Sequence, residues 1–161
     1  MRRPIAIWFL KIYFVWGVAR DIQLIITHKI STDYSIFQAN EISQLFFIFV
    51  TAIFVLDFLA SYFLIRPKMT GFWIGITAIS SSLLFNGISL SLALRDLESV
   101  RKAYEFSRQA RGLVVREELL NKIFTPEGMQ ATFAFSAMFS IAAIIIVFRN
   151  KWYFNVEDTE E

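Results

Sequence analysis

Residues 42–65 read ISQLFFIFVTAIFVLDFLASYFLI, and this apolar stretch decides the class of fold. Crossing the hydrocarbon core of a bilayer, about 30 Å thick, takes roughly 20 mostly apolar residues at about 1.5 Å of helix rise each. The stretch reaches that length with Asp57 as its single charged residue. We therefore expect it to form a helix that spans a membrane.

Three further segments have the length and apolar character of membrane-spanning helices, and they cover residues 5–26, 71–94 and 128–148. Of the 161 residues, 56% are hydrophobic and 19% are charged, which is too apolar for a soluble domain of this size. The first segment is longer than a typical signal-peptide core and contains Lys11, so we expect it to be retained as a helix. The sequence thus predicts an all-α integral membrane protein with one four-helix domain over residues 1–161.

The connections between these segments carry start and stop signals for helices. Between the second and third segments, Pro67 is expected to end a helix and Thr70 to cap the next one. This turn is so short that the two helices must be antiparallel. Before the fourth segment, Thr125 is an expected N-cap and Pro126 an expected first helical residue. Residues 27–39 have the composition of a polar linker.

Residues 95–124 differ from the spans because acidic and basic residues recur through them. Glu98 and Lys102 are spaced as a favourable pair on one helix face, and Gly112 predicts a break between two helices. We expect a helical hairpin, or an extension of the third span. It is either a solvated connector or a surface that docks a partner or lies at the lipid headgroups.

Positive charge occurs on both sides of the predicted membrane. One side has short basic clusters beside helix ends, at Arg2, Arg3, Arg66, Lys68, Arg149 and Lys151. The other side has more basic residues in total, but acidic residues are mixed with them. Because the first helix often sets topology, we expect both termini in the cytoplasm, in a plasma membrane or a bacterial inner membrane.

Asp57 is the charged residue that most needs a partner in this bundle. A charge near the bilayer centre costs about 2.5–3.5 kcal/mol on insertion scales, so such a residue normally faces other helices. Counted from one membrane face, Asp57 and Lys11 lie at similar depths of about 13 and 10 Å. We expect them to pair, with a further hydrogen bond from Ser61 one turn away. A protonated Asp57, or an Asp57 that handles protons or ions, is the alternative.

A second polar group is expected toward the opposite membrane face. Arg20 and Asp21 lie near the end of the first segment and Asn86 near the end of the third, where they would line a cleft. Adjacent residues of a helix point about 100° apart, so we expect Arg20 and Asp21 to have separate partners or to contact water. The simpler interpretation is that Arg20 extends to the membrane surface.

Small and polar residues form a narrow stripe along one side of the third segment. The stripe contains Gly71, Gly75, Ala78, Ser82, Asn86, Ser89 and Ala93. A similar face on the fourth segment contains Thr132, Ser136, Ser140 and Ala143. Small residues let helices approach closely where lipid supplies no hydrophobic drive for association. We expect both faces to be packed, within one bundle or between protomers.

The residue sets of catalysis and cofactor binding are not recognisable in this sequence. It has one histidine and no cysteine, and it contains no paired nucleophile and base and no phosphate-binding loop. Its basic residues are interleaved with acidic ones, which argues against nucleic-acid binding. We therefore expect no enzyme activity, no cofactor, no metal and no nucleic acid.

Two classes of function remain. We favour a non-catalytic membrane subunit that assembles with itself or with partner proteins through the small-residue face inside the membrane. Outside the membrane, a soluble partner would bind the connector or the acidic tail, residues 155–161, which we expect to be disordered. The alternative is a small oligomeric channel or transporter whose polar path includes Asp57. A water-accessible route past Asp57 favours the channel, and a sealed core favours the subunit.

Overall fold

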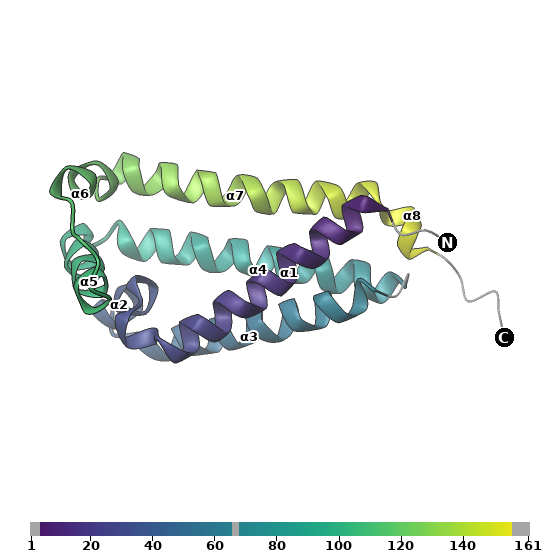
Figure 1. The fold of residues 1–161 in the computed structure, drawn as a ribbon, viewed down its shortest axis with the longest axis horizontal. Helices are drawn as coiled ribbons and strands as arrows, with labels where there is room; N and C mark the ends of the chain where they lie inside the picture. Colours follow the sequence, from purple (N-terminus) through teal and green to yellow (C-terminus); the bar gives the residue numbers. More distant parts are fainter. Residues whose placement is uncertain (1–3, 66–67, 156–161) are drawn as a thin grey trace.

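The computed structural model describes residues 4–65 and 68–155, and every regular element in that part of the chain is a helix. The four long helices are α1 (Ile5–Ile26), α3 (Ser43–Phe63), α4 (Met69–Ala93) and α7 (Pro126–Arg149). Figure 1 shows α3, α4 and α7 running along the bundle while α1 crosses them obliquely. The predicted all-helical fold is confirmed for the described residues.

The shorter elements are η1 (His28–Ile30), α2 (Thr32–Ala39), α5 (Leu97–Ala110), α6 (Glu117–Ile123) and α8 (Lys151–Phe154). Helices α2, α5 and α6 lie at one end of the bundle and α8 lies at the other (Figure 1). We call residues 97–123, which form α5, α6 and the turn between them, the cap. The predicted break in the connector is present, because the cap turns at Gly112, whose φ of 68° lies in the region that favours glycine.

Residues 27–39 are not the plain polar linker that their composition predicts. They form η1 and α2, and α2 buries Ile36 and Phe37 in the cluster that also contains Phe46 and Phe85. The ring centroids of Phe37 and Phe85 are 5.6 Å apart in a stacked arrangement. Tyr34 packs on the same cluster, so one side of this mostly polar segment docks it as a helix on the bundle.

Three helices, α3, α4 and α7, are long and apolar enough to cross a membrane. Helix α1 has the bounds that the sequence predicts, but every 18-residue window of it contains Lys11, Arg20 and Asp21, which is too much charge for that criterion. The fold thus has three candidate spans among its described helices. A fourth span through α1 stays a prediction.

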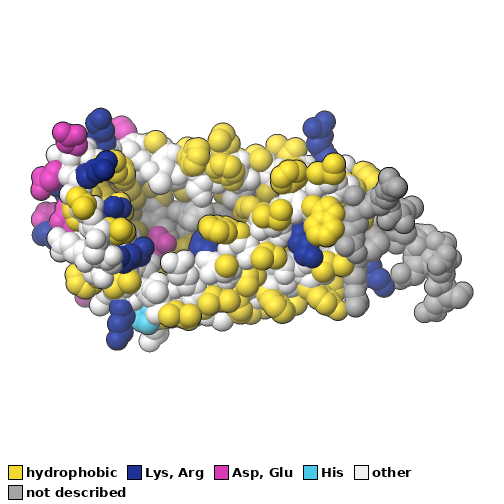
Figure 2. All heavy atoms as spheres, viewed as in Figure 1, with side chains coloured by type: hydrophobic (Ala, Val, Ile, Leu, Met, Phe, Trp, Pro, Cys, Tyr) yellow, Lys and Arg dark blue, Asp and Glu magenta, His cyan; other side chains and the backbone are white. Residues whose placement is uncertain are grey.

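The outer surface of the long helices is strongly apolar. Figure 2 shows hydrophobic side chains along the length of the bundle and acidic side chains gathered over the cap. Side chains at least 47% exposed include Trp8, Phe9, Trp16, Phe58, Trp73, Leu84, Phe135, Phe139 and Phe148. An apolar surface of this extent is unusual for a protein that faces water on all sides.

The small-residue stripe of α4 is buried within the chain. Six of its seven members are buried, namely Gly71, Gly75, Ala78, Ser82, Ser89 and Ala93. A Cβ atom on Gly71 would lie 2.8 Å from the backbone oxygen of Phe63 in α3, and one on Gly75 would lie 3.9 Å from the ring of Phe14 in α1. The stripe therefore lets α3 and α1 approach α4 in the same molecule, and it is not a free surface for a second copy.

The helix-start signals had different outcomes. Thr125 caps α7 as expected, because its Oγ1 accepts a hydrogen bond from the Gly128 amide at 3.0 Å, and Pro126 is the first helical residue. Thr70 does not cap α4, because the helix begins at Met69 with Lys68 as its N-cap, two residues earlier than expected. The predicted signals at Arg2, Arg3, Arg66 and Pro67, and the acidic tail beyond Asn155, lie outside the described residues.

Candidate functional site

Asp57 lies in the middle of the bundle between two apolar clusters. On α3 it stands between Ile53 of the cluster nearer the cap and Ala60 of the cluster nearer α8. It is 3% exposed and faces α1, where a Cβ atom at Gly17 would overlap its carboxylate. The carboxylate interacts electrostatically with Arg20 and Asp21 of α1. Glycine at position 17 thus makes room for an acid at position 57.

The predicted ion pair between Asp57 and Lys11 is wrong for the described structure. The Lys11 ammonium instead lies 5.2 Å from the centroid of the Trp8 ring. Gly17, which faces Asp57, is about 9 Å along α1 from Lys11 and about 120° around the helix. Residue counts give comparable depths only where both helices run parallel to one axis, whereas α1 crosses the bundle obliquely (Figure 1).

Two other predicted contacts also differ from the structure. The Ser61 hydroxyl donates to the backbone oxygen of Phe58 at 2.8 Å, so its hydrogen bond goes to its own helix and not to Asp57. Arg20 and Asp21 pair with each other, with Arg20 Nε and Nη2 at 3.0 and 2.9 Å from Asp21 Oδ1. The long arginine side chain spans the 100° between adjacent positions, which the expectation of separate partners ignored.

The Arg20–Asp21 pair is asymmetric in its exposure. The Asp21 side chain is 2% exposed and the Arg20 side chain is 45% exposed. Asp21 Oδ2 has no hydrogen-bond partner in the described structure. Arg20 also interacts electrostatically with Asp57 and with Asp33 of α2. Arg20 thus forms an ion pair with Asp21 and acts on Asp57 and Asp33 only through its electrostatic field.

Asn86 lines a polar cavity of about 220 Å³ between α2, α4 and α7. Its polar lining consists of Asp33, Asn86, Ser89, Thr132 and Ser136, and its apolar lining of Ile36, Leu90, Met129 and Phe133. The Asn86 amide donates to the Ser136 hydroxyl at 3.3 Å. Figure 2 shows the molecule hollowed between the cap and the middle of the bundle, where these helices border one another.

Two side chains that line the polar cavity differ from the others, because, among the described residues, Ser89 has an unpaired hydroxyl and Asp33 has a raised pKa. Ser89 is 8% exposed, and its Oγ has no hydrogen-bond partner in the described structure. Burial raises the pKa of Asp33 above its ordinary value, and the positive charge of Arg20 opposes that rise. The described residues contain no group of three histidine, aspartate or glutamate side chains that is able to hold a metal ion. The cavity therefore combines a mostly apolar surface with a few hydroxyl, amide and carboxyl groups, and among the described residues it has no metal site of that kind.

Beyond Asp57, toward α8, the interior is apolar. Leu10, Phe14, Leu64 and Phe72 fill it, and each is no more than 1% exposed. Asp57 is thus a buried acidic side chain with an apolar cluster on each side of it, and it is not among the residues that line the cavity at Asn86.

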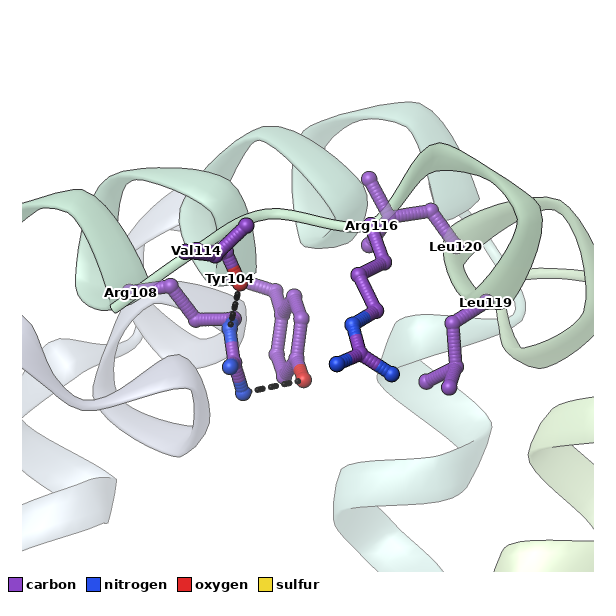
Figure 3. Close-up of a pocket in the computed structure, with 6 residues that line it drawn as sticks. All are labelled: Tyr104, Arg108, Val114, Arg116, Leu119 and Leu120. Atoms are coloured by element: carbon purple, nitrogen blue, oxygen red, sulfur yellow. Dashed lines mark hydrogen bonds between the residues drawn. The ribbon is translucent and has the colours of Figure 1, made fainter.

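A second pocket of about 220 Å³ lies in the cap and was missed by sequence reasoning. It is lined by Tyr104, Arg108, Val114, Arg116, Leu119 and Leu120 (Figure 3). We call it the cap pocket. In the sequence, acidic and basic residues alternate around its two arginines, so the two arginines are not recognisable as a pair. Their position eight residues apart, on either side of the turn-forming Gly112, was the available signal.

Comparisons with known proteins gave no relative for this chain. It matches no family model, and no curated protein and no solved structure matches it. The function is therefore argued from the fold, the polar residues of the bundle and the cap pocket.

Proposed function

We propose that the protein is a non-catalytic membrane subunit in which α1, α3, α4 and α7 all cross the bilayer. The observation that carries this proposal is the outer surface of α1, where Phe9, Ile12 and Trp16 are 64%, 64% and 74% exposed. That surface continues the apolar exterior of the three candidate spans. In water, such residues would form a large exposed patch, whereas in lipid they are in their favoured solvent.

The three charged residues of α1 are compatible with a span. Asp21 is buried and paired with Arg20, which lowers the cost of placing either charge away from water. Arg20 lies in the last two turns of α1, close enough to the membrane surface for its side chain to extend there. Lys11 lies against the ring of Trp8, which is one turn nearer the amino end of α1. This cation–π contact is favourable.

Assembly with partners is the proposed role, and the surfaces for it differ from the initial expectation. The small-residue face of α4 is occupied within the chain, so a partner would contact the outer apolar faces or the cap. The cap combines charged residues with Phe106, Leu113 and Val114, which are 58%, 46% and 74% exposed. We propose further that both termini are cytoplasmic, in a plasma membrane or bacterial inner membrane, with the cap on the other side.

The assembly proposal is tested on the full chain purified in mild detergent. Co-purifying proteins are identified by mass spectrometry, and the size of the complex is measured by light scattering. Changing Val114 to serine is expected to release partners while the thermal midpoint is kept. If the chain is a monomer without co-purifying protein in each detergent that keeps it folded, the assembly role is wrong.

A small transporter is the second candidate, and two separate features favour it, namely the buried Asp57 of α3 and the polar cavity between α2, α4 and α7. Transport would require the apolar side chains beyond Asp57, including Phe14 and Phe72, to move apart, or a path between protomers. Flux of protons and small cations into proteoliposomes tests this role. Loss of flux in Asp57→Asn, with unchanged thermal stability, would favour transport over assembly.

A further inference from the structure

The cap pocket gathers hydrogen-bond donors and positive charge from two separate parts of the cap. Tyr104 and Arg108 lie one turn apart on α5, and Arg116 is the N-cap residue of α6. Figure 3 shows the Tyr104 hydroxyl between the two guanidinium groups, with all three groups on the same side of the cap. The turn at Gly112 brings these groups together.

Neutral groups hold Arg108 in place. Its Nε donates to the backbone oxygen of Val114 at 3.0 Å, and its Nη1 donates to the Tyr104 hydroxyl at 3.2 Å. The guanidinium also lies 5.7 Å from the centroid of the Tyr104 ring. Because the hydroxyl accepts from Arg108, its own proton remains to be donated, as do the hydrogens of Arg108 Nη2. Two of the pocket's donors, Arg108 and Tyr104, are thus held in position by each other and by the backbone.

The positive charge of the pocket is not neutralised by the described residues. The ion pairs of the cap are Arg101 with Glu105 at 2.9 Å and Lys102 with Glu98 at 2.6 Å, and neither pocket arginine forms one. None of the pocket-lining residues is acidic. Two guanidinium groups that face one space repel each other. An anion bound between them would attract both and offset that repulsion.

We propose that the cap pocket binds a phosphate group, either of free phosphate or of a phospholipid headgroup. The guanidinium fork of Arg116, the remaining hydrogens of Arg108 and the Tyr104 hydroxyl together match the several oxygens of a phosphate better than the two of a carboxylate. A volume of about 220 Å³ admits that group, and Leu119 and Leu120 provide an apolar wall on one side. The phospholipid source rests on the four-span arrangement proposed above, which puts the cap at the membrane boundary. Binding of free phosphate does not rest on it.

The test has two arms, both on the full chain in a non-ionic detergent without phosphate. In the first arm, the thermal midpoint is followed against inorganic phosphate, with chloride at equal ionic strength as control. In the second arm, short-chain phosphatidylglycerol is added to the micelles and compared with a short-chain diacylglycerol that lacks the phosphate. A rise in the first arm identifies a free anion as a ligand, and a rise in the second arm alone identifies a lipid headgroup.

Arg116→Gln is the decisive variant, because the Arg116 side chain forms no hydrogen bond or ion pair with another described residue, and only its backbone oxygen accepts hydrogen bonds in α6. It should weaken phosphate binding about tenfold or more, since charge-assisted hydrogen bonds are lost. Lys122→Gln is the matched control, with the same charge change at an exposed site of α6. Tyr104→Phe should give a smaller loss, and Arg116→Lys an intermediate one. The proposal is overturned if neither arm raises the midpoint, or if the Arg116 and Lys122 variants lose the effect equally.

Discussion

Gly17 and Asp57 are packed directly against each other, with the backbone of α1 on the carboxylate of α3. A side chain at position 17 has no space, because its Cβ atom would overlap the carboxylate and lie 3.0 Å from Asp57 Cγ. This contact fixes how closely α1 approaches α3 at the centre of the bundle. It also brings Arg20 and Asp21, one turn further along α1, within electrostatic reach of Asp57.

Gly17→Ala should therefore lower the free energy of unfolding by about 1–3 kcal/mol, the usual cost of overfilling a packed interior. The loss should shrink markedly in the background of Asp57→Ala, where the space becomes free, and a double-mutant cycle measures that coupling. Gly87→Ala on α4 is the control, because nothing lies within 4 Å of its Cβ position. Equal effects of Gly17→Ala with and without Asp57 would contradict the contact.

The small-residue stripe of α4 predicts that substitutions along it will lower stability to different degrees. Gly71→Ala should be destabilising, because the new Cβ atom would meet the Phe63 backbone oxygen, which moves only with its helix. Gly75→Ala should be tolerated, since 3.9 Å to the Phe14 ring is an ordinary contact, whereas Gly75→Leu should separate α1 from α4. Thermal midpoints in one detergent measure the series. Similar midpoints for the Gly71 and Gly75 alanine variants would show that the stripe does not set the helix spacing.

Asp33 should make stability depend on pH. A folded-state pKa raised by burial means that the folded chain keeps a proton that the unfolded chain has released. Stability should therefore fall as pH rises from the ordinary value of 3.8 through the raised pKa, and change little above it. Over that pH range, the thermal midpoint of the Asp33→Asn variant should rise relative to the midpoint of the unaltered chain. A constant difference across the range would argue against an Asp33 that keeps its proton in the folded chain.

Ser89→Ala tests the polar cavity. The Ser89 hydroxyl is buried without a hydrogen-bond partner, so its removal should leave stability unchanged or raise it by about 1 kcal/mol. Ser136→Ala is the comparison, because it removes the acceptor of the Asn86 amide and should cost a similar amount. A large loss in Ser89→Ala would mean that this hydroxyl binds something in the folded chain, such as an ordered water.

The local features of the fold were readable from the sequence, and the contacts between helices were not. Apolar runs and the Thr125 cap define helices with their own residues, so the bounds of α1 were predictable. Whether Lys11 or Gly17 faces Asp57 depends on the crossing angle of α1, which no local pattern specifies. The cap pocket likewise depends on the turn at Gly112, which brings two arginines from separate helices to one space.

The central claim is that α1 crosses the membrane despite its three charged residues, and side-specific labelling tests it most directly. The chain has no cysteine, so a single cysteine at Pro4 or at Lys29, on either side of α1, is a unique label site. A membrane-impermeant maleimide is applied to intact cells and to inverted vesicles. We predict that the two positions react from opposite sides. Reaction of both positions from the same side would contradict the four-span arrangement.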